Sequence, residues 1–214
     1  MDPVIVATVI AAAALGGGIG WLQQHNLNRL SYRQPDEIAI PAAGRRTWVV
    51  WVSAAVWGCV AAKVILPGGD VWGLLPFLPL MVSGPGLAAV DFDVMRLPNR
   101  TLLPTGIAAV ALLVAASVAD SRPSMMVSGL IGLLITGGLF AGLAAISGGR
   151  LGGGDVKLAA VIGAALGAHS LVSIWLALLI GSIAAIAWIK AKGSQGPLPY
   201  GPWLLLGALV ATLT

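Results

Sequence analysis

Long apolar runs separated by short polar stretches divide the chain into eight segments. Hydrophobic residues fill each run, without the two-residue alternation of a membrane β-barrel strand. Because a spanning helix needs about 20 mostly apolar residues, the pattern predicts an all-α polytopic membrane protein with eight transmembrane helices. The predicted spans are Val4–Leu22, Thr47–Leu66, Val71–Val90, Thr101–Ala119, Met125–Ile146, Val156–Gly167, Leu171–Ile189 and Trp203–Leu213.

The sixth and seventh spans could instead form one long helix. The sequence favours two helices, because residues 167–170 (Gly-Ala-His-Ser) are typical of a turn. Charge agrees, since Lys157 precedes the pair and Lys190 and Lys192 follow it. The positive-inside rule puts both of these ends on one side of the membrane, which requires two crossings.

Lysine and arginine are distributed unequally between the two sides of this topology. Ten of the twelve border the loops that follow the first, third, fifth and seventh spans, and only Lys63 and Arg122 border the others. The bias predicts that the ten-cation side is cytoplasmic and that both termini lie outside. The ten are Arg29, Arg33, Arg45, Arg46, Arg96, Arg100, Arg150, Lys157, Lys190 and Lys192.

Composition agrees with a membrane protein: 58% of the 214 residues are hydrophobic and 9% are charged. Soluble domains carry roughly 25% charged residues, so a soluble domain or a nucleic-acid-binding protein is excluded. One cysteine, Cys59, allows no internal disulfide or cysteine-rich zinc site. The two histidines, His25 and His169, lie on opposite predicted sides, so we expect no metal site.

Acidic residues are few, and one group follows the third span. Asp91 comes directly after an apolar run, and Pro98 and Asn99 are typical of a turn before the next helix. Asp93 is a further candidate, although we interpret it as a solvated loop charge. In an extended turn, residues two apart point the same way, so both aspartates could face a common site. At a helix end they diverge by about 200°, and only one of them could.

A second acidic group precedes the sixth span. Gly152, Gly153 and Gly154 stand before Asp155, and Lys157 follows two residues later. Glycine lets a backbone turn and approach a partner closely, so we expect these glycines to leave room for an extended substrate and a helix to start at Asp155. Lys157 either adjusts the acidic site or extends toward the membrane surface.

These segments resemble the motifs of the type IV prepilin peptidases, a family of membrane aspartyl proteases. Asp91 with Pro98 and Asn99 is similar to the family's first aspartate motif. Residues 152–158 (GGGDVKL) are similar to its G-x-G-D signature, and residues 199–204 (PYGPWL) to its C-terminal element. The resemblance covers residues 71–214.

The resemblance implies an endopeptidase that removes the cytoplasmic leader of prepilin-like precursors in the cell membrane. By motif position, Asp91 and Asp155 would be the catalytic pair. Two close carboxyls share a proton and so supply both an acid and a base. Proteolysis would need no cofactor. S-adenosylmethionine-dependent methylation, which many members perform, is left open because the first loop, residues 23–46, is degenerate and lacks the family's two C-x-x-C pairs.

Residues 1–214 are thus interpreted as one membrane-embedded peptidase domain with a prepilin-like substrate, lipid contacts and no nucleic-acid partner. A preflagellin peptidase or another G-x-G-D intramembrane protease is the alternative within proteolysis. A small proton-coupled transporter is the alternative of another class, since intramembrane carboxylates also relay protons. A structural membrane component would leave the paired aspartate motifs unexplained. The oligomeric state is left open.

Overall fold

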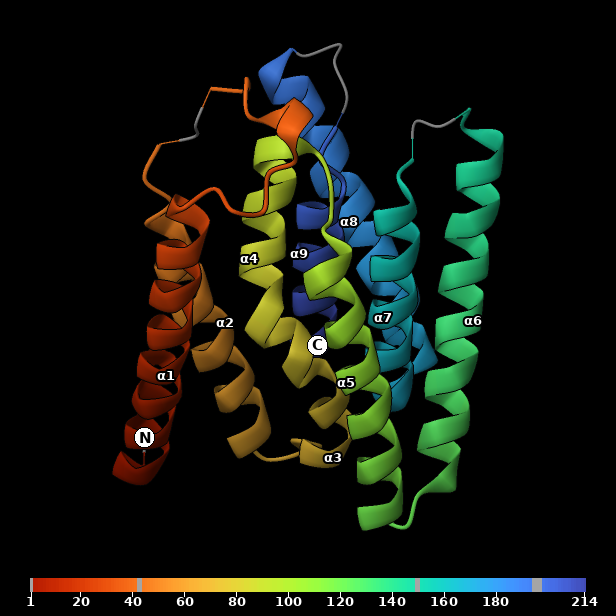
Figure 1. The fold of residues 1–214 in the computed structure, drawn as a ribbon. Coiled ribbons are helices and arrows are strands. Elements are labelled where there is room, and N and C mark those ends of the chain that lie inside the picture. Colours follow the sequence, from red (N-terminus) through yellow and green to blue (C-terminus); the bar gives the residue numbers. More distant parts are fainter. Residues whose placement is uncertain (1, 42–43, 149–150, 194–197) are drawn as a thin grey trace.

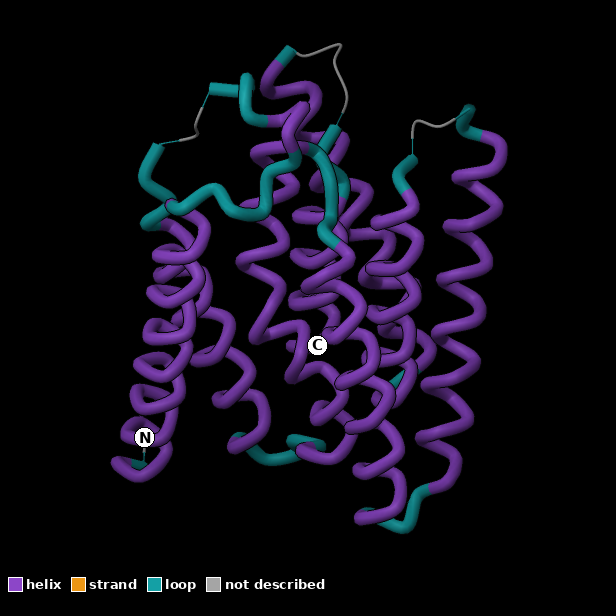
Figure 2. Tube along the Cα trace, viewed as in Figure 1, coloured by secondary structure: helices purple, strands orange, loops and turns teal. Residues whose placement is uncertain are grey.

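The computed structural model describes residues 2–41, 44–148, 151–193 and 198–214, and all regular structure within them is helical (Figures 1 and 2). The helices run side by side along one axis. The longer elements are α1 (Pro3–Asn28), α2 (Trp48–Ile65), α4 (Leu78–Val94), α5 (Asn99–Ala119), α6 (Pro123–Ile146), α7 (Gly153–His169), α8 (Leu171–Lys192) and α9 (Gly201–Leu213). The short ones are α3 (Val71–Leu74) and two 3₁₀ turns, Pro35–Glu37 and Leu75–Phe77.

The eight predicted segments are all present as helices, and the third is built from α3, a 3₁₀ turn and α4. Six of them are long and apolar enough to cross a membrane, and α9 is a shorter apolar helix. The fold is therefore that of a polytopic helical membrane protein. The ambiguous region forms two helices, because Ser170 is extended and its side chain accepts a hydrogen bond from the Val172 N–H at the start of α8.

One predicted boundary is wrong in an informative way. The third span was expected to end at Val90, but α4 continues to Val94 and contains Asp91 and Asp93. The helix continues past the apolar run because both carboxylates find partners within the protein. Met95 then ends the helix in a left-handed conformation with φ +52°.

The helix ends that the α1–α2, α4–α5, α6–α7 and α8–α9 connections join all lie at one end of the bundle, here called the long-loop end (Figure 1). Helices α4, α5, α7 and α9 form the centre, with α1 and α2 on one flank and α6 on the other. The core residues Leu87, Leu102, Ile162 and Leu204 come from these four central helices and are each at most 1% exposed.

The cation distribution follows the same division. Nine of the ten predicted cations border the long-loop end, and Arg150 lies outside the described residues. Lys63 and Arg122 lie at the opposite end, near the last turn of α2 and the start of α6. The long-loop end is thus the cation-rich end of the bundle, and its orientation in a membrane stays a prediction.

Candidate active site

Asp91 lies in the last turn of α4 and is 3% exposed. Its Oδ2 accepts a hydrogen bond of 3.0 Å from the backbone N–H of Gly201, the first residue of α9. A helix N-terminus carries unsatisfied N–H groups and a partial positive charge, so it can hold a carboxylate without a cationic side chain. The C-terminal helix therefore fixes the position of this carboxyl.

Asp155 lies at the start of α7, close to the same end of α4. The helix begins at Gly153 rather than at Asp155, because Gly152 is extended and its carbonyl already accepts from the Asp155 N–H at 3.0 Å. Asp155 therefore occupies the first helical turn, where the helix dipole favours a negative charge.

The two aspartates line one polar cavity of about 340 Å³ at the long-loop end. It lies where the end of α4, the start of α5 and the start of α7 meet, with one residue from the first loop. All eight predicted catalytic and supporting residues except Pro98 line this cavity. Its lining comprises Gln34, Asp91, Met95, Arg96, Leu97, Asn99, Gly152, Gly153, Gly154, Asp155 and Lys157.

Leu97, in the first aspartate motif, packs against Gly154 of the second motif and Gly201 of the third. Sequence reasoning missed this contact. A Cβ on Gly154 would stand 2.9 Å from the Leu97 Cβ, and a Cβ on Gly201 would stand 3.0 Å from Asp91 Oδ2 and 3.3 Å from a Leu97 methyl. Gly154 and Gly201 are therefore needed for close packing inside the protein. Of the three glycines before Asp155, only Gly153 has open space around it, so the room that was expected at all three is present at that residue alone.

Asn99 and Lys157, both predicted as supporting residues, are in direct contact. The Lys157 ammonium donates to Asn99 Oδ1 at 2.8 Å, which joins the first turn of α5 to the second turn of α7. Pro98 precedes α5 as its N-cap residue and so sets the start of that helix. These contacts give the supporting residues a structural role beside the cavity.

Asp93 is not the solvated loop charge that the sequence suggested. It lies in the last turn of α4, and its side chain is 2% exposed. Arg33 donates to both carboxylate oxygens at 2.9 Å, Arg46 forms an ion pair at 3.1 Å, and the Tyr32 hydroxyl donates to Oδ2. The helix thus turns Asp93 away from the cavity and into a cluster of compensating cations.

The first loop reaches the cavity, which sequence reasoning also missed. Gln34 lines it, and Glu37 binds the cavity residue Arg96 through two hydrogen bonds of 2.8 and 2.9 Å. The hydrogen bonds from Arg96 hold the pKa of Glu37 below its ordinary value. The only sequence signal was the concentration of charged and polar residues in this loop.

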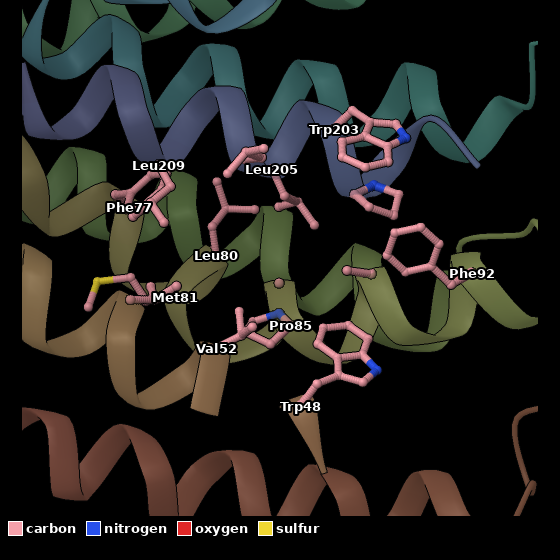
Figure 3. A pocket seen from close by; sticks show the side chains of 15 residues that line it. Trp48, Val52, Phe77, Leu80, Met81, Pro85, Phe92, Trp203, Leu205 and Leu209 are labelled. Carbon is pink, nitrogen blue, oxygen red and sulfur yellow. The ribbon is translucent and has the colours of Figure 1, made fainter. Parts of the chain in front are cut away.

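A second cavity, here called the groove, lies between α2, α4 and α9 and is lined by apolar residues (Figure 3). Figure 3 shows Trp48 and Val52 of α2 facing Trp203, Leu205 and Leu209 of α9 across the α4 side chains. This groove measures about 290 Å³, and none of its lining residues is ionisable. Acid–base chemistry can therefore take place in the polar cavity and not in the groove.

Within the described ranges, no three His, Cys, Asp or Glu side chains converge to hold a metal ion. His169 lies near Asp70 at the opposite end from the cavity, and His25 lies near the end of α1. Metal independence stays a prediction for the activity itself.

Comparison with known proteins agrees with the motif resemblance. The model of the type IV leader peptidase family matches residues 80–189, which include both cavity aspartates. A prepilin leader peptidase/N-methyltransferase from Bacillus subtilis (strain 168) is 35% identical over 164 residues, which cover 74% of this chain and 63% of that protein. A protein of the same name from Aeromonas salmonicida (strain A449) is 29% identical over 179 residues, which cover 80% of this chain and 59% of the relative.

The chain therefore spans about three fifths of the length of these curated relatives. A third protein of that name, from Pectobacterium carotovorum subsp. carotovorum, is 30% identical over 156 residues, or 70% of this chain and 53% of its own. No solved structure matches the chain.

Proposed function

Since this chain belongs to the type IV leader peptidase family, we propose that it is a membrane aspartyl endopeptidase that removes the leader from prepilin-like precursors. Asp91 and Asp155 are its catalytic residues in this proposal. The supporting observation is that two carboxyls from different helices line one polar cavity at one end of an apolar bundle.

The chemistry needs a water activated by a base and a carbonyl polarised by an acid. Two nearby carboxyls that share one proton supply both functions, and they titrate as a pair. The described residues contain no ion pair to either carboxyl, so neither charge is cancelled. A proton relay is less well supported, because every acidic residue lies in a loop or a terminal helical turn.

The direct test uses the purified protein in detergent. Its substrate is a model precursor with a short basic leader that ends in glycine before an apolar helix. We expect a single cut at the leader boundary, measured by mass spectrometry of both products. A preparation that leaves the precursor intact, while a bacterial prepilin peptidase cuts it under the same conditions, would refute the proposal.

We also propose that the protein lies in the cytoplasmic membrane with its long-loop end in the cytoplasm, as the cation bias predicts. Single cysteines at Ser147 and Asn99 in a Cys59→Ala background would test this. We expect both to react with a membrane-impermeant thiol reagent only after the membrane is opened. Labelling of either in intact cells would contradict this orientation.

Methyl transfer is a separate question, because both relatives are named prepilin leader peptidase/N-methyltransferase. The chain has no cysteine pair in its first loop, so we propose that cleavage does not require S-adenosylmethionine. Mass spectrometry of the processed N-terminus, with and without that compound, would measure this. We expect equal cleavage in both and little methylated product, and a fully methylated N-terminus would show that the loop supports transfer.

A further inference from the structure

The first loop is bound to α4 through an ion pair with Asp93, two residues after Asp91. Arg33 forms a forked pair with both oxygens of Asp93, and the side chains of the two residues are 3% and 2% exposed. Arg46 adds a second cation at 3.1 Å and donates to the Leu27 carbonyl at 2.9 Å. This first attachment is therefore buried and joined to the end of α1.

A second attachment lies on the other side of Gln34. Glu37 and Arg96 form a forked pair, and Arg96 also donates to the Tyr32 carbonyl at 3.2 Å. Glu37 Oε2 accepts from the Gln34 backbone N–H at 2.8 Å. The side chain of Glu37 thus links the backbone of Gln34 to a residue of the α4–α5 turn.

The two attachments together fix the residue between them. Asp93 and Arg96 follow Asp91 by two and five positions, so the loop is held by the same short segment that carries this carboxyl. Gln34 lines the cavity with both aspartates. Its carboxamide offers donors and an acceptor, which match the alternating N–H and C=O groups of an extended peptide.

Stability alone is a weak explanation for such an arrangement. Buried ion pairs are often no more stabilising than apolar side chains of similar size, because desolvation offsets the attraction. What a forked arginine–carboxylate pair supplies is a defined geometry. Two such pairs on either side of Gln34 therefore indicate that the position of Gln34 in the cavity matters for function.

We propose that residues 32–37 of the first loop form a fixed wall of the cavity in which Gln34 contacts the substrate's peptide backbone. Asp93, Glu37 and Arg96 are positioning residues that hold this wall. The inference rests on the proposed peptidase function, and it assigns the first loop a role in proteolysis that is independent of methyl transfer.

The test measures KM and kcat for the model precursor with three loop variants. Gln34→Ala is expected to raise KM about five- to tenfold, as for one lost hydrogen bond, with kcat within about twofold of wild type. Glu37→Gln should raise KM in the same direction, and Glu37→Asp should restore part of the loss. Asp36→Asn is the matched control, because Asp36 is an exposed carboxyl of the same loop outside the cavity lining.

A binding measurement separates contact from chemistry. In an Asp155→Asn background, which cannot cut, Gln34→Ala should weaken binding of the labelled precursor by the same factor as it raises KM. Gln34 is exposed, so its variant tests the proposal even if a Glu37 variant fails to accumulate.

Two results would overturn the inference while the function stands: a wild-type KM and affinity for Gln34→Ala, or an equal shift for Asp36→Asn. A wild-type protein that cuts nothing would instead refute the proposed function, and the wall with it.

Discussion

Asp91 and Asp93 stand two residues apart in one helical turn and lie in opposite surroundings. Asp91 faces the cavity, where a backbone N–H holds one oxygen and no described cation pairs with it. Asp93 faces Arg33, Arg46 and Tyr32, which fully compensate its charge. Both carboxyls are buried, so burial alone does not identify a reactive acid. The difference is whether the charge is already neutralised.

The largest expected effect is the loss of cleavage in Asp91→Asn and Asp155→Asn. Asparagine keeps the size of the side chain but cannot share the proton, so each change should lower kcat by several orders of magnitude. The double variant should be no worse than either single one, since the two act as a unit. The measurement is kcat of protein extracted from membranes, with its amount as the control. Strong activity in either variant would remove that residue from the pair.

Asp93→Asn should act on stability and not on chemistry. It leaves Arg33 and Arg46 buried without their carboxylate, and breaking a buried pair costs about 3 kcal/mol or more. We expect a lower unfolding temperature in detergent, with kcat largely retained where the protein is folded. If Asp93→Asn were inactive with an unchanged unfolding temperature while Asp91→Asn stayed active, the catalytic role would belong to Asp93 and not to Asp91.

Gly153 and Gly154 are also neighbours in different surroundings, because Gly154 is closely packed and Gly153 has open space around it. A Cβ at 154 would press on Leu97 at 2.9 Å, so Gly154→Ala should destabilise the protein by about 1–3 kcal/mol. A Cβ at 153 meets nothing within 4 Å, so Gly153→Ala should leave the unfolding temperature unchanged or slightly raised. If Gly153→Ala keeps its stability but loses affinity for the precursor, the open space at 153 is used by the substrate. Equal unfolding temperatures for both variants would contradict the packing argument.

The smallest expected effect is that of metal removal. A carboxyl pair needs no metal ion, so treatment with EDTA should leave the cleavage rate of the model precursor within error of the untreated enzyme. The control is the same treatment followed by excess Mg²⁺ or Zn²⁺. Activity that is lost to EDTA and restored by one of these ions would show that the acids act as ligands.

The apolar pattern predicted all eight helical segments because lipid imposes length and hydropathy on each helix separately. The aspartate motifs predicted which carboxyls line the cavity, since each lies at a helix boundary on the same side. Contacts between distant segments left no such signal. Gly201 meets Asp91 across 110 residues, and Arg33 meets Asp93 across 60. Hydropathy therefore could not show that Asp93 is neutralised or that Gln34 reaches the cavity.

The two shortest spans, α7 and α9, both begin beside the cavity. At 1.5 Å per residue, the 13 residues of α9 extend about 20 Å and the 17 of α7 about 26 Å, against a hydrocarbon layer of about 30 Å. Both helices lie in the centre of the bundle, so this shortfall concerns the interior of the protein rather than the lipid around it, and headgroups and water can fill it. In the proposed hydrolase, water that enters there from the long-loop end would reach the carboxyl pair.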